Sequence, residues 1–274
     1  MLNFKTPVIT VHTMLRYLFM LAALFLLTPG FVPEKKPKPT IYLIGDSTVK
    51  NGSGKGEGGL WGWGAFLHAQ FDTSKISIIN RALGGRSSRT FMSEGLWDKV
   101  LAKVKPGDYV FIQFGHNDSS PVNDSSRARG TLKGTGEESE EIDNILTNKY
   151  EIVHTYGWYI RKYISDAKAK GAIPVVCSPV PRNIWENGKV IRASGDYGKW
   201  AKESAQAEKA FFIDLNEIIA AKYDPLGENE VTVKLFLTDH THTNEAGAII
   251  NAQAVAEGIK QLQGCKLKRF LVVF

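Results

Sequence analysis

The sequence has few of the residues that mark a disulfide-stabilised or zinc-stabilised protein. Only two of its 274 residues are cysteines, which excludes a cysteine-rich scaffold and a zinc site built from paired cysteines. Cys177 lies in an apolar segment, where we expect a buried, unreactive thiol. A bridge to Cys265 is not the expected state, because nothing in the sequence places the two Cα atoms within reach. With no internal repeat and no linker-like stretch after residue 40, one domain is predicted.

A large excess of charge of one sign is also missing. The formal net charge is only +6, and the basic residues are interleaved with acidic ones along helix-like stretches. Solvated helix faces account for this pattern better than a nucleic-acid-binding surface does. No nucleic acid is therefore predicted as a partner.

Long apolar runs are absent at the N-terminus as well. The run at residues 17–27 is shorter than the roughly 20 residues that cross a bilayer. Residues 1–33 contain two basic residues and no acidic one, which is typical of a secretory signal peptide. We therefore expect a secreted or periplasmic protein without a stable membrane span. The cleavage site stays undefined, and an uncleaved N-terminal anchor is the alternative.

From residue 40 on, short apolar runs alternate with longer stretches of helical periodicity. Five runs are interpreted as buried strands, at residues 41–45, 76–79, 109–114, 173–178 and 211–215. The clearest helices are predicted at residues 150–170, 197–209 and 244–263. This alternation predicts a parallel sheet covered on both faces, that is, a three-layer α/β/α sandwich over residues 40–264. The sequence leaves open whether the tail at residues 265–274 packs or stays loose.

Two stretches fit neither strands nor helices. Residues 51–64 are rich in glycine and include Trp61 and Trp63, whereas residues 119–148 are polar and acidic. Both follow the ends of predicted strands, so we expect them to wall a cleft. A solvent-exposed insertion is the alternative for the second stretch. The two tryptophans can stack on sugar rings or pack in the core.

Residues that suit acyl transfer lie at both ends of the chain. Ser47 follows the first apolar run, and Asp239 and His242 lie near the C-terminus. A serine hydroxyl becomes a nucleophile when an imidazole takes its proton, and the imidazole works best when a carboxylate orients it. The turn at residues 84–86 and the side chain of Asn117 follow other strands, so they converge on the same sheet edge and can donate to an oxyanion.

A metal site is the alternative interpretation of the C-terminal motif. Asp239, His240 and His242 offer three possible ligands, but no further cluster of histidine or cysteine completes a site. No metal is therefore predicted, and His240 is assigned a structural role.

Four blocks of sequence together resemble a known superfamily. They read GDST at residues 45–48, GRSSRT at 85–90, FGHND at 114–118 and DHTHT at 239–243. In this order they resemble the SGNH, or GDSL-type, hydrolases, and more narrowly the rhamnogalacturonan acetylesterases. The resemblance implies a flavodoxin-like fold, an acetylated pectic polysaccharide as substrate and no cofactor. It implies Ser47 as nucleophile, His242 as base and Asp239 as its orienter, and an oxyanion hole formed by Ser47, Gly85 and Asn117.

Substrate contacts are less defined by the sequence. Arg86, Arg89 and Arg182 fall near the ends of predicted strands, where they can pair with uronate carboxylates or make structural ion pairs. An esterase acting on acetylated xylan or on lipid acyl esters is the competing function. A carbohydrate-binding module with a relict site is the alternative from another class. The sequence leaves the polymer, the acetyl position and the oligomeric state open.

Overall fold

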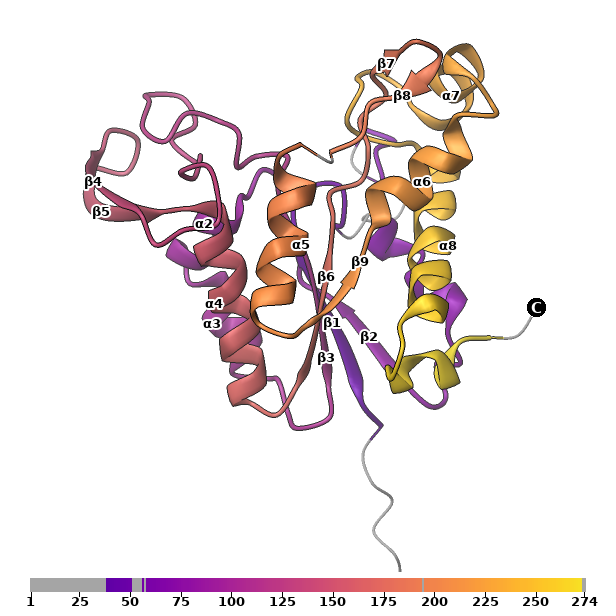
Figure 1. Cartoon of the computed structure of the whole chain (residues 1–274), viewed down its shortest axis with the longest axis horizontal. Helices are drawn as coiled ribbons and strands as arrows, with labels where there is room; N and C mark the ends of the chain where they lie inside the picture. Colours follow the sequence, from indigo (N-terminus) through magenta and orange to yellow (C-terminus); the bar gives the residue numbers. More distant parts are fainter. Residues whose placement is uncertain (1–37, 51–55, 57, 194, 273–274) are drawn as a thin grey trace, which may run out of the picture. The chain divides into compact units, whose positions relative to one another are not determined.

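A parallel five-stranded sheet forms the middle of the fold (Figure 1). The computed structural model describes residues 38–272, apart from residues 51–55, 57 and 194. The strand order is β2-β1-β3-β6-β9, and every neighbouring pair is parallel. These strands are β1 (Thr40–Gly45), β2 (Ser77–Asn80), β3 (Tyr109–Gln113), β6 (Ile173–Cys177) and β9 (Phe211–Ile213). The predicted α/β/α fold is confirmed, and each predicted strand is present.

Helices cover both faces of the sheet, as Figure 1 shows. Alternate residues of β1 point to opposite faces: Tyr42 and Ile44 belong to one apolar core, and Ile41 and Leu43 to the other. The first core contains side chains of α2 (Ser88–Ser93), α3 (Leu96–Leu101), α4 (Tyr156–Ala169) and α5 (Tyr197–Ala207). The second contains side chains of α6 (Leu215–Tyr223), α7 (Glu228–Leu235) and α8 (Glu245–Gln261), and of the 3₁₀ helices η1 (Trp63–Ala65), η2 (Leu67–Gln70) and η3 (Lys266–Phe270).

Helix ends follow the expected local chemistry. The side chain of Asn244 caps α8 by accepting from the backbone N–H of Gly247, as asparagine commonly does at this position. Gly171 and Gly264 follow α4 and α8 with φ angles of +72° and +73°, a conformation that glycine adopts without strain.

The predicted helix at residues 150–170 begins too early. Lys149–His154 is strand β5, which pairs antiparallel with β4 (Ser139–Asn144), so the stretch interpreted as a loop contains half of a hairpin. The helix begins only at Tyr156, where the side chain of Thr155 caps it. Tyr150 and Ile152 are 61% and 45% exposed on this hairpin, so their apolar character does not mark a helix face. A second hairpin joins β7 (Trp185–Glu186) to β8 (Lys189–Val190).

The C-terminal tail packs on the same compact unit, Lys38–Phe274. Leu267 and Phe270 are buried, and the backbone N–H of Asp72 donates to the carbonyl of Phe270 at 2.8 Å. Both cysteines are buried and unbridged. The signal peptide predicted at residues 1–33 lies outside the described residues. Among the helices that the structure describes, none has the length and apolar character needed to cross a bilayer.

Candidate active site

The turn that carries Ser47 is held against the end of β3. A side chain at position 45 would bring its Cβ within 2.5 Å of the carbonyl oxygen of Gln113, so this close approach of two backbones requires glycine. The carbonyl of Asp46 then accepts from the N–H groups of Val49 and Lys50 at 3.2 and 3.0 Å. As a result the chain turns sharply after β1, and Ser47 is left partly exposed at the carboxyl edge of the sheet.

Three side chains from the two ends of the chain form one hydrogen-bonded series. The Nε2 atom of His242 lies 2.8 Å from Ser47 Oγ, and its Nδ1 atom lies 2.8 Å from Asp239 Oδ2. Because a carboxylate only accepts, the proton of the neutral ring belongs on Nδ1, which leaves Nε2 to accept from the serine hydroxyl. The structure thus brings together Ser47, His242 and Asp239 in an arrangement that suits proton transfer from the serine.

The carboxylate of Asp239 is well supplied with donors. Its Oδ1 atom accepts from the backbone N–H groups of Thr241 and His242 at 2.6 and 2.7 Å. Burial alone would raise the pKa of Asp239, but hydrogen bonds from the His242 ring and from these N–H groups outweigh burial and lower the pKa. Asp239 therefore stays ionised while it orients the imidazole.

Two turns, one with Ser47 and one with Gly84 and Gly85, bring backbone N–H groups close to the serine hydroxyl. Gly84 lies against Ser47, since a Cβ on it would stand 3.7 Å from Ser47 Cβ. Gly85 has a φ of +79°, so its peptide adopts an orientation that L side chains rarely allow. Among the described residues, no hydrogen bond uses the N–H of Ser47 or of Gly85. Both N–H groups are thus available to a developing oxyanion.

The side chain of Asn117 is the third available donor. It is 7% exposed, and its Nδ2 atom donates to the carbonyl of Arg86 at 2.9 Å. An amide nitrogen carries two protons, so this bond fixes the orientation of the amide and leaves one N–H for a ligand.

A buried polar network supports the Ser47 turn from below. The Oδ1 atom of Asp46 accepts from the N–H and the hydroxyl of Thr48, each at 2.8 Å. Gln113 donates to Thr48 Oγ1 at 2.7 Å and accepts from the indole N–H of Trp63 at 2.8 Å. Trp63 is only 1% exposed, so its faces are not available to a sugar ring. Of the two roles that the sequence left open for it, Trp63 has the packing role.

A second histidine faces the other oxygen of Asp46. His116 Nδ1 lies 3.3 Å from Asp46 Oδ2, within ion-pair distance although outside hydrogen-bond geometry. His116 Nε2 lies 3.0 Å from the carbonyl of Val180, which can only accept. Burial alone would raise the pKa of Asp46, but His116 and the donors on Thr48 outweigh burial and lower it. His116 and Asp46 lie 70 residues apart in the chain, so no local sequence pattern links the two side chains.

Asp118 is the other buried carboxyl group beneath the site. Its Oδ1 atom accepts from the N–H and the hydroxyl of Ser88. Burial, with the Asp46 carboxylate acting in the same direction, outweighs these hydrogen bonds and raises the pKa of Asp118 to about 7. The pKa values of Asp46 and Asp118 therefore shift in opposite directions.

The arginines singled out in the sequence differ in what they contact. Arg86 forms an ion pair with Glu94 at 2.9 Å. Arg89 is fully buried and pairs with Glu151, so it cannot reach a substrate carboxylate. Arg182 donates to Thr241 Oγ1 at 2.6 Å and to the carbonyl of His116 at 3.3 Å. Within the part of the chain that the structure describes, no carboxylate lies within ion-pair distance of Arg182.

Backbone hydrogen bonds place Trp61 beside the loop at residues 239–243, which carries Asp239 and His242. Its N–H donates to the carbonyl of Thr243 at 2.9 Å, and the hydroxyl of Thr243 donates back at 3.0 Å. Its ring contacts Phe66 at a centroid distance of 5.1 Å and is partly exposed. Trp61 therefore remains a candidate for contact with a substrate.

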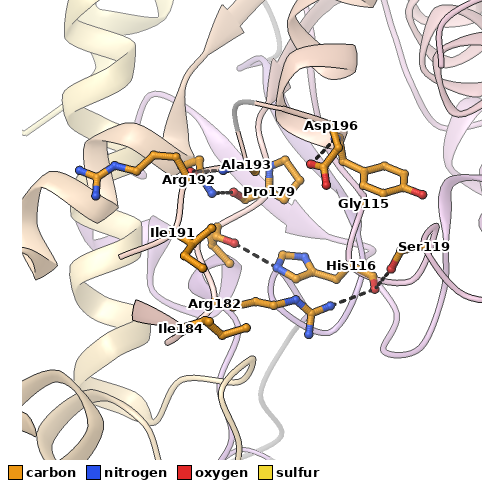
Figure 2. Close-up of a pocket in the computed structure, with 13 residues that line it drawn as sticks. Gly115, His116, Ser119, Pro179, Arg182, Ile184, Ile191, Arg192, Ala193 and Asp196 are labelled. Carbon is orange, nitrogen blue, oxygen red and sulfur yellow. Dashed lines mark hydrogen bonds between the residues drawn. The ribbon is translucent and has the colours of Figure 1, made fainter. Parts of the chain in front are cut away.

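A pocket of about 190 Å³ adjoins this region on the side of β6 (Figure 2). Arg182 and His116 line it together with apolar side chains that include Ile184 and Ile191. These isoleucines are 38% and 47% exposed. In Figure 2 the Arg182 guanidinium lies beside the His116 ring. Arg182 also donates to Thr241, the residue before His242. The pocket therefore lies next to the hydrogen-bonded series of Ser47, His242 and Asp239.

A further side chain at the glycine turn is Arg129, which comes from the segment 119–148. Its Nη1 atom donates to the carbonyl of Gly85 at 2.9 Å, and its Nε atom donates to Ser120 Oγ at 3.1 Å. Arg129 stands outside all four motif blocks, and no local pattern marks it.

Within the described ranges, no group of three or more histidine, cysteine, aspartate or glutamate side chains could hold a metal ion. His240 contacts its neighbour Thr241, with Nδ1 and Oγ1 3.0 Å apart.

Comparison with known proteins identifies similar chains. The GDSL-like Lipase/Acylhydrolase family model matches residues 43–249. A probable rhamnogalacturonan acetylesterase of Bacillus subtilis, YesY, is 37% identical over 227 residues, which cover 81% of this chain and 93% of that protein. A rhamnogalacturonan acetylesterase of Emericella nidulans is 30% identical over 80% of this chain and 84% of its own length.

A solved structure is similar as well. The crystal structure of the YxiM protein of Bacillus subtilis superposes with a TM-score of 0.67 at 27% identity. The match covers 84% of this chain and 58% of that one. The family match spans all the blocks noted in the sequence and confirms the resemblance: the chain is an ester hydrolase of the GDSL-like Lipase/Acylhydrolase family.

Proposed function

We propose that this enzyme is a serine acetylesterase that removes acetyl groups from rhamnogalacturonan through an acetyl-enzyme. The single observation that carries the proposal is the series of 2.8 Å contacts from Asp239 through His242 to Ser47, next to unoccupied donors on Ser47 and Gly85. The names of the similar proteins support acetyl as the acyl group and rhamnogalacturonan as the polymer.

In the proposed reaction, Ser47 Oγ attacks the acetyl carbonyl while its proton passes to His242 Nε2. The carbonyl oxygen becomes an oxyanion that accepts from the N–H groups of Ser47 and Gly85 and from the Asn117 amide. The bond to the sugar oxygen then breaks, and His242 delivers its proton to that oxygen. A water attacks the acetyl-enzyme by the same route, and acetate leaves with Ser47 restored.

Charge supports an acidic polymer as the substrate. Arg182 has a guanidinium without a carboxylate partner among the described residues, and it lies between the catalytic loop and the pocket. A planar guanidinium suits a carboxylate because it can donate two parallel hydrogen bonds. We propose that Arg182 pairs with a galacturonate carboxylate near the acetylated sugar and that Trp61 lies along the polymer.

Ester hydrolysis tests the proposal directly, measured as acetate released from the acetylated polymers and as p-nitrophenolate released from the p-nitrophenyl esters. Purified enzyme is given acetylated rhamnogalacturonan, acetylated xylan, p-nitrophenyl acetate and p-nitrophenyl octanoate. We expect the fastest turnover on the pectic polymer, and loss of all turnover in Ser47→Ala with an unchanged melting temperature. Undiminished turnover in Ser47→Ala would refute the nucleophile, and a preference for xylan or octanoate would refute the proposed substrate.

The role of Arg182 is tested by comparing a substrate that has a carboxylate with one that has none. In Arg182→Ala, we expect KM for acetylated rhamnogalacturonan to rise roughly three- to tenfold, as for loss of one charge-assisted contact. Turnover of p-nitrophenyl acetate, which has no carboxylate, should change little. An equal loss on both substrates would show that Arg182 supports the catalytic loop instead.

We also propose that the chain is exported, on the basis of residues 1–33. Fractionation of cells that produce the full chain, followed by N-terminal sequencing of the exported form, tests this. Retention of an intact N-terminus in the cytoplasm would contradict it.

A further inference from the structure

Two successive carbonyls of the glycine turn are held by side chains from elsewhere in the chain. The carbonyl of Arg86 accepts from Asn117, and the carbonyl of Gly85 accepts from Arg129 Nη1 at 2.9 Å. Arg129 also packs closely on the turn, since a Cβ on Gly85 would stand 3.4 Å from Nη1. The two peptide groups that follow the Gly85 N–H are thus both fixed by side-chain hydrogen bonds.

The segment that carries Arg129 is anchored on both sides. Before it, Asp124 Oδ1 accepts from the backbone N–H groups of Arg127 and Ala128 at 2.6 and 2.7 Å. After it, the carbonyl of Gly130 accepts from the buried Arg89 at 2.8 Å, and the N–H of Thr131 donates to the carbonyl of Asp118 at 3.1 Å. Hydrogen bonds on both sides therefore fix the backbone that places Arg129 next to the turn.

The charge on Arg129 is not neutralised by a direct partner. In the described part of the chain, no carboxylate lies within ion-pair distance of its guanidinium. Burial, and then the charge of Arg127, lower the pKa of Arg129, whereas the Asp46 and Asp118 carboxylates act in the opposite direction. Arginine nevertheless stays protonated in proteins, so a positive charge is kept at the turn.

We propose that Arg129 is a positioning residue of the oxyanion hole: by holding the Gly85–Arg86 peptide it restricts rotation of the turn at Gly85, so that the preceding Gly84–Gly85 peptide keeps its N–H toward the acetyl oxygen, and its charge favours the oxyanion. This inference rests on the proposed function, because it assigns Arg129 to the same hole. An interaction that strengthens as negative charge develops acts on the transition state and changes kcat more than KM.

The experiment compares Arg129→Ala and Arg129→Lys with wild type and with Arg127→Ala. Arg127 is exposed in the same segment and serves as the matched control. With p-nitrophenyl acetate, we expect Arg129→Ala to lose on the order of 10- to 100-fold in kcat, somewhat less than loss of a direct oxyanion donor. KM should stay within about twofold, and Arg127→Ala should behave as wild type.

Two further measurements separate positioning from packing. Arg129→Lys keeps a charge and a donor, so its kcat should lie between wild type and Arg129→Ala, and added guanidinium should restore part of the activity of Arg129→Ala. Phenylboronic acid, which forms a tetrahedral adduct with a serine oxygen, should bind Arg129→Ala more weakly by about the factor lost in kcat. If Arg129→Ala does not fold, the kcat and boronate affinity of Arg129→Lys carry the test.

Each outcome decides the inference. Unchanged kcat in Arg129→Ala, or a loss that neither lysine nor guanidinium restores and that leaves boronate affinity unchanged, would overturn the role of Arg129 alone. An inactive wild type, or a fully active Ser47→Ala, would overturn the proposed function and this inference together.

Discussion

Two aspartate–histidine pairs flank the turn that carries Ser47, and they differ in what faces the second ring nitrogen. In the Asp239–His242 pair, that nitrogen faces a serine hydroxyl, which can donate a proton. In the Asp46–His116 pair, it faces the carbonyl of Val180, which can only accept. The first imidazole is free to act as a base, whereas the second must keep its proton to hold its contact.

Exposure separates the same two pairs. The side chains of His242 and Asp239 are 29% and 41% exposed, whereas those of His116 and Asp46 are 5% and 0% exposed. A base that exchanges protons with substrate and water must be reached by them, and a buried pair is not reached. An aspartate–histidine pair is therefore not marked as a proton-transfer pair or a structural pair by its residue types alone. Its burial and the partner of the second ring nitrogen distinguish the two roles.

The largest effect is expected from the exposed pair. Asp239→Asn should lower turnover of p-nitrophenyl acetate by on the order of 10³–10⁴, because the amide no longer holds the imidazole in the required tautomer. Stability should change little, since Asp239 is partly exposed. Steady-state kinetics and thermal unfolding measure both, and Asp98→Asn on the exposed side of α3 is the control. Only a small loss would mean that another group orients His242.

The buried pair should respond in the opposite way. Asp46→Asn keeps an oxygen for Thr48 but removes the charge that faces His116. Leaving a buried polar group without its partner costs about 1–3 kcal/mol, so we expect the free energy of unfolding in urea to fall by an amount in that range. Turnover per folded molecule should fall far less than in Asp239→Asn. A variant as stable as wild type but as inactive as Asp239→Asn would erase the distinction between the pairs.

The smallest effect concerns pH and Asp118. Its pKa is raised to about 7 in the folded protein, so the folded state binds this proton more tightly than the unfolded state. The resulting stability is complete below the ordinary pKa of an aspartate and is lost as the pH rises through about 7. Asp46, whose pKa is lowered, contributes stability above that ordinary value and loses it as the pH falls.

Urea unfolding at pH 5 and pH 8 measures this dependence. Wild type should be less stable at pH 8, and Asp118→Asn should reduce the difference between the two pH values, because an amide does not ionise. An unchanged difference in Asp118→Asn would assign the pH dependence to another group.

Much of the fold was predictable because its signals are local. The continuous apolar runs that become β1, β3 and β6 are buried on both faces, so composition alone marks them. The hairpin of β4 and β5 was missed because its apolar side chains Tyr150 and Ile152 face outward. The spacing of these exposed side chains therefore resembles the start of the helix that follows.

The residues of the candidate site likewise fall into those that a local motif marks and those that only the fold brings in. Ser47, Gly85, Asn117 and His242 each follow an element end and carry a motif, so the sequence could place them at one edge. The contacts of His116 and Arg129 could not be predicted, because they join segments 70 and 44 residues apart through the fold alone.

The buried guanidinium of Arg89 has a practical consequence for engineering. It donates to both carboxylate oxygens of Glu151 on the β5 hairpin and to the carbonyls of Val122 and Gly130. Trimming residues 119–154 would leave this cation without partners inside the protein, a state that costs several kcal/mol. Loop exchanges intended to alter substrate choice should therefore replace the tip of the hairpin and retain the acid and carbonyls at its base.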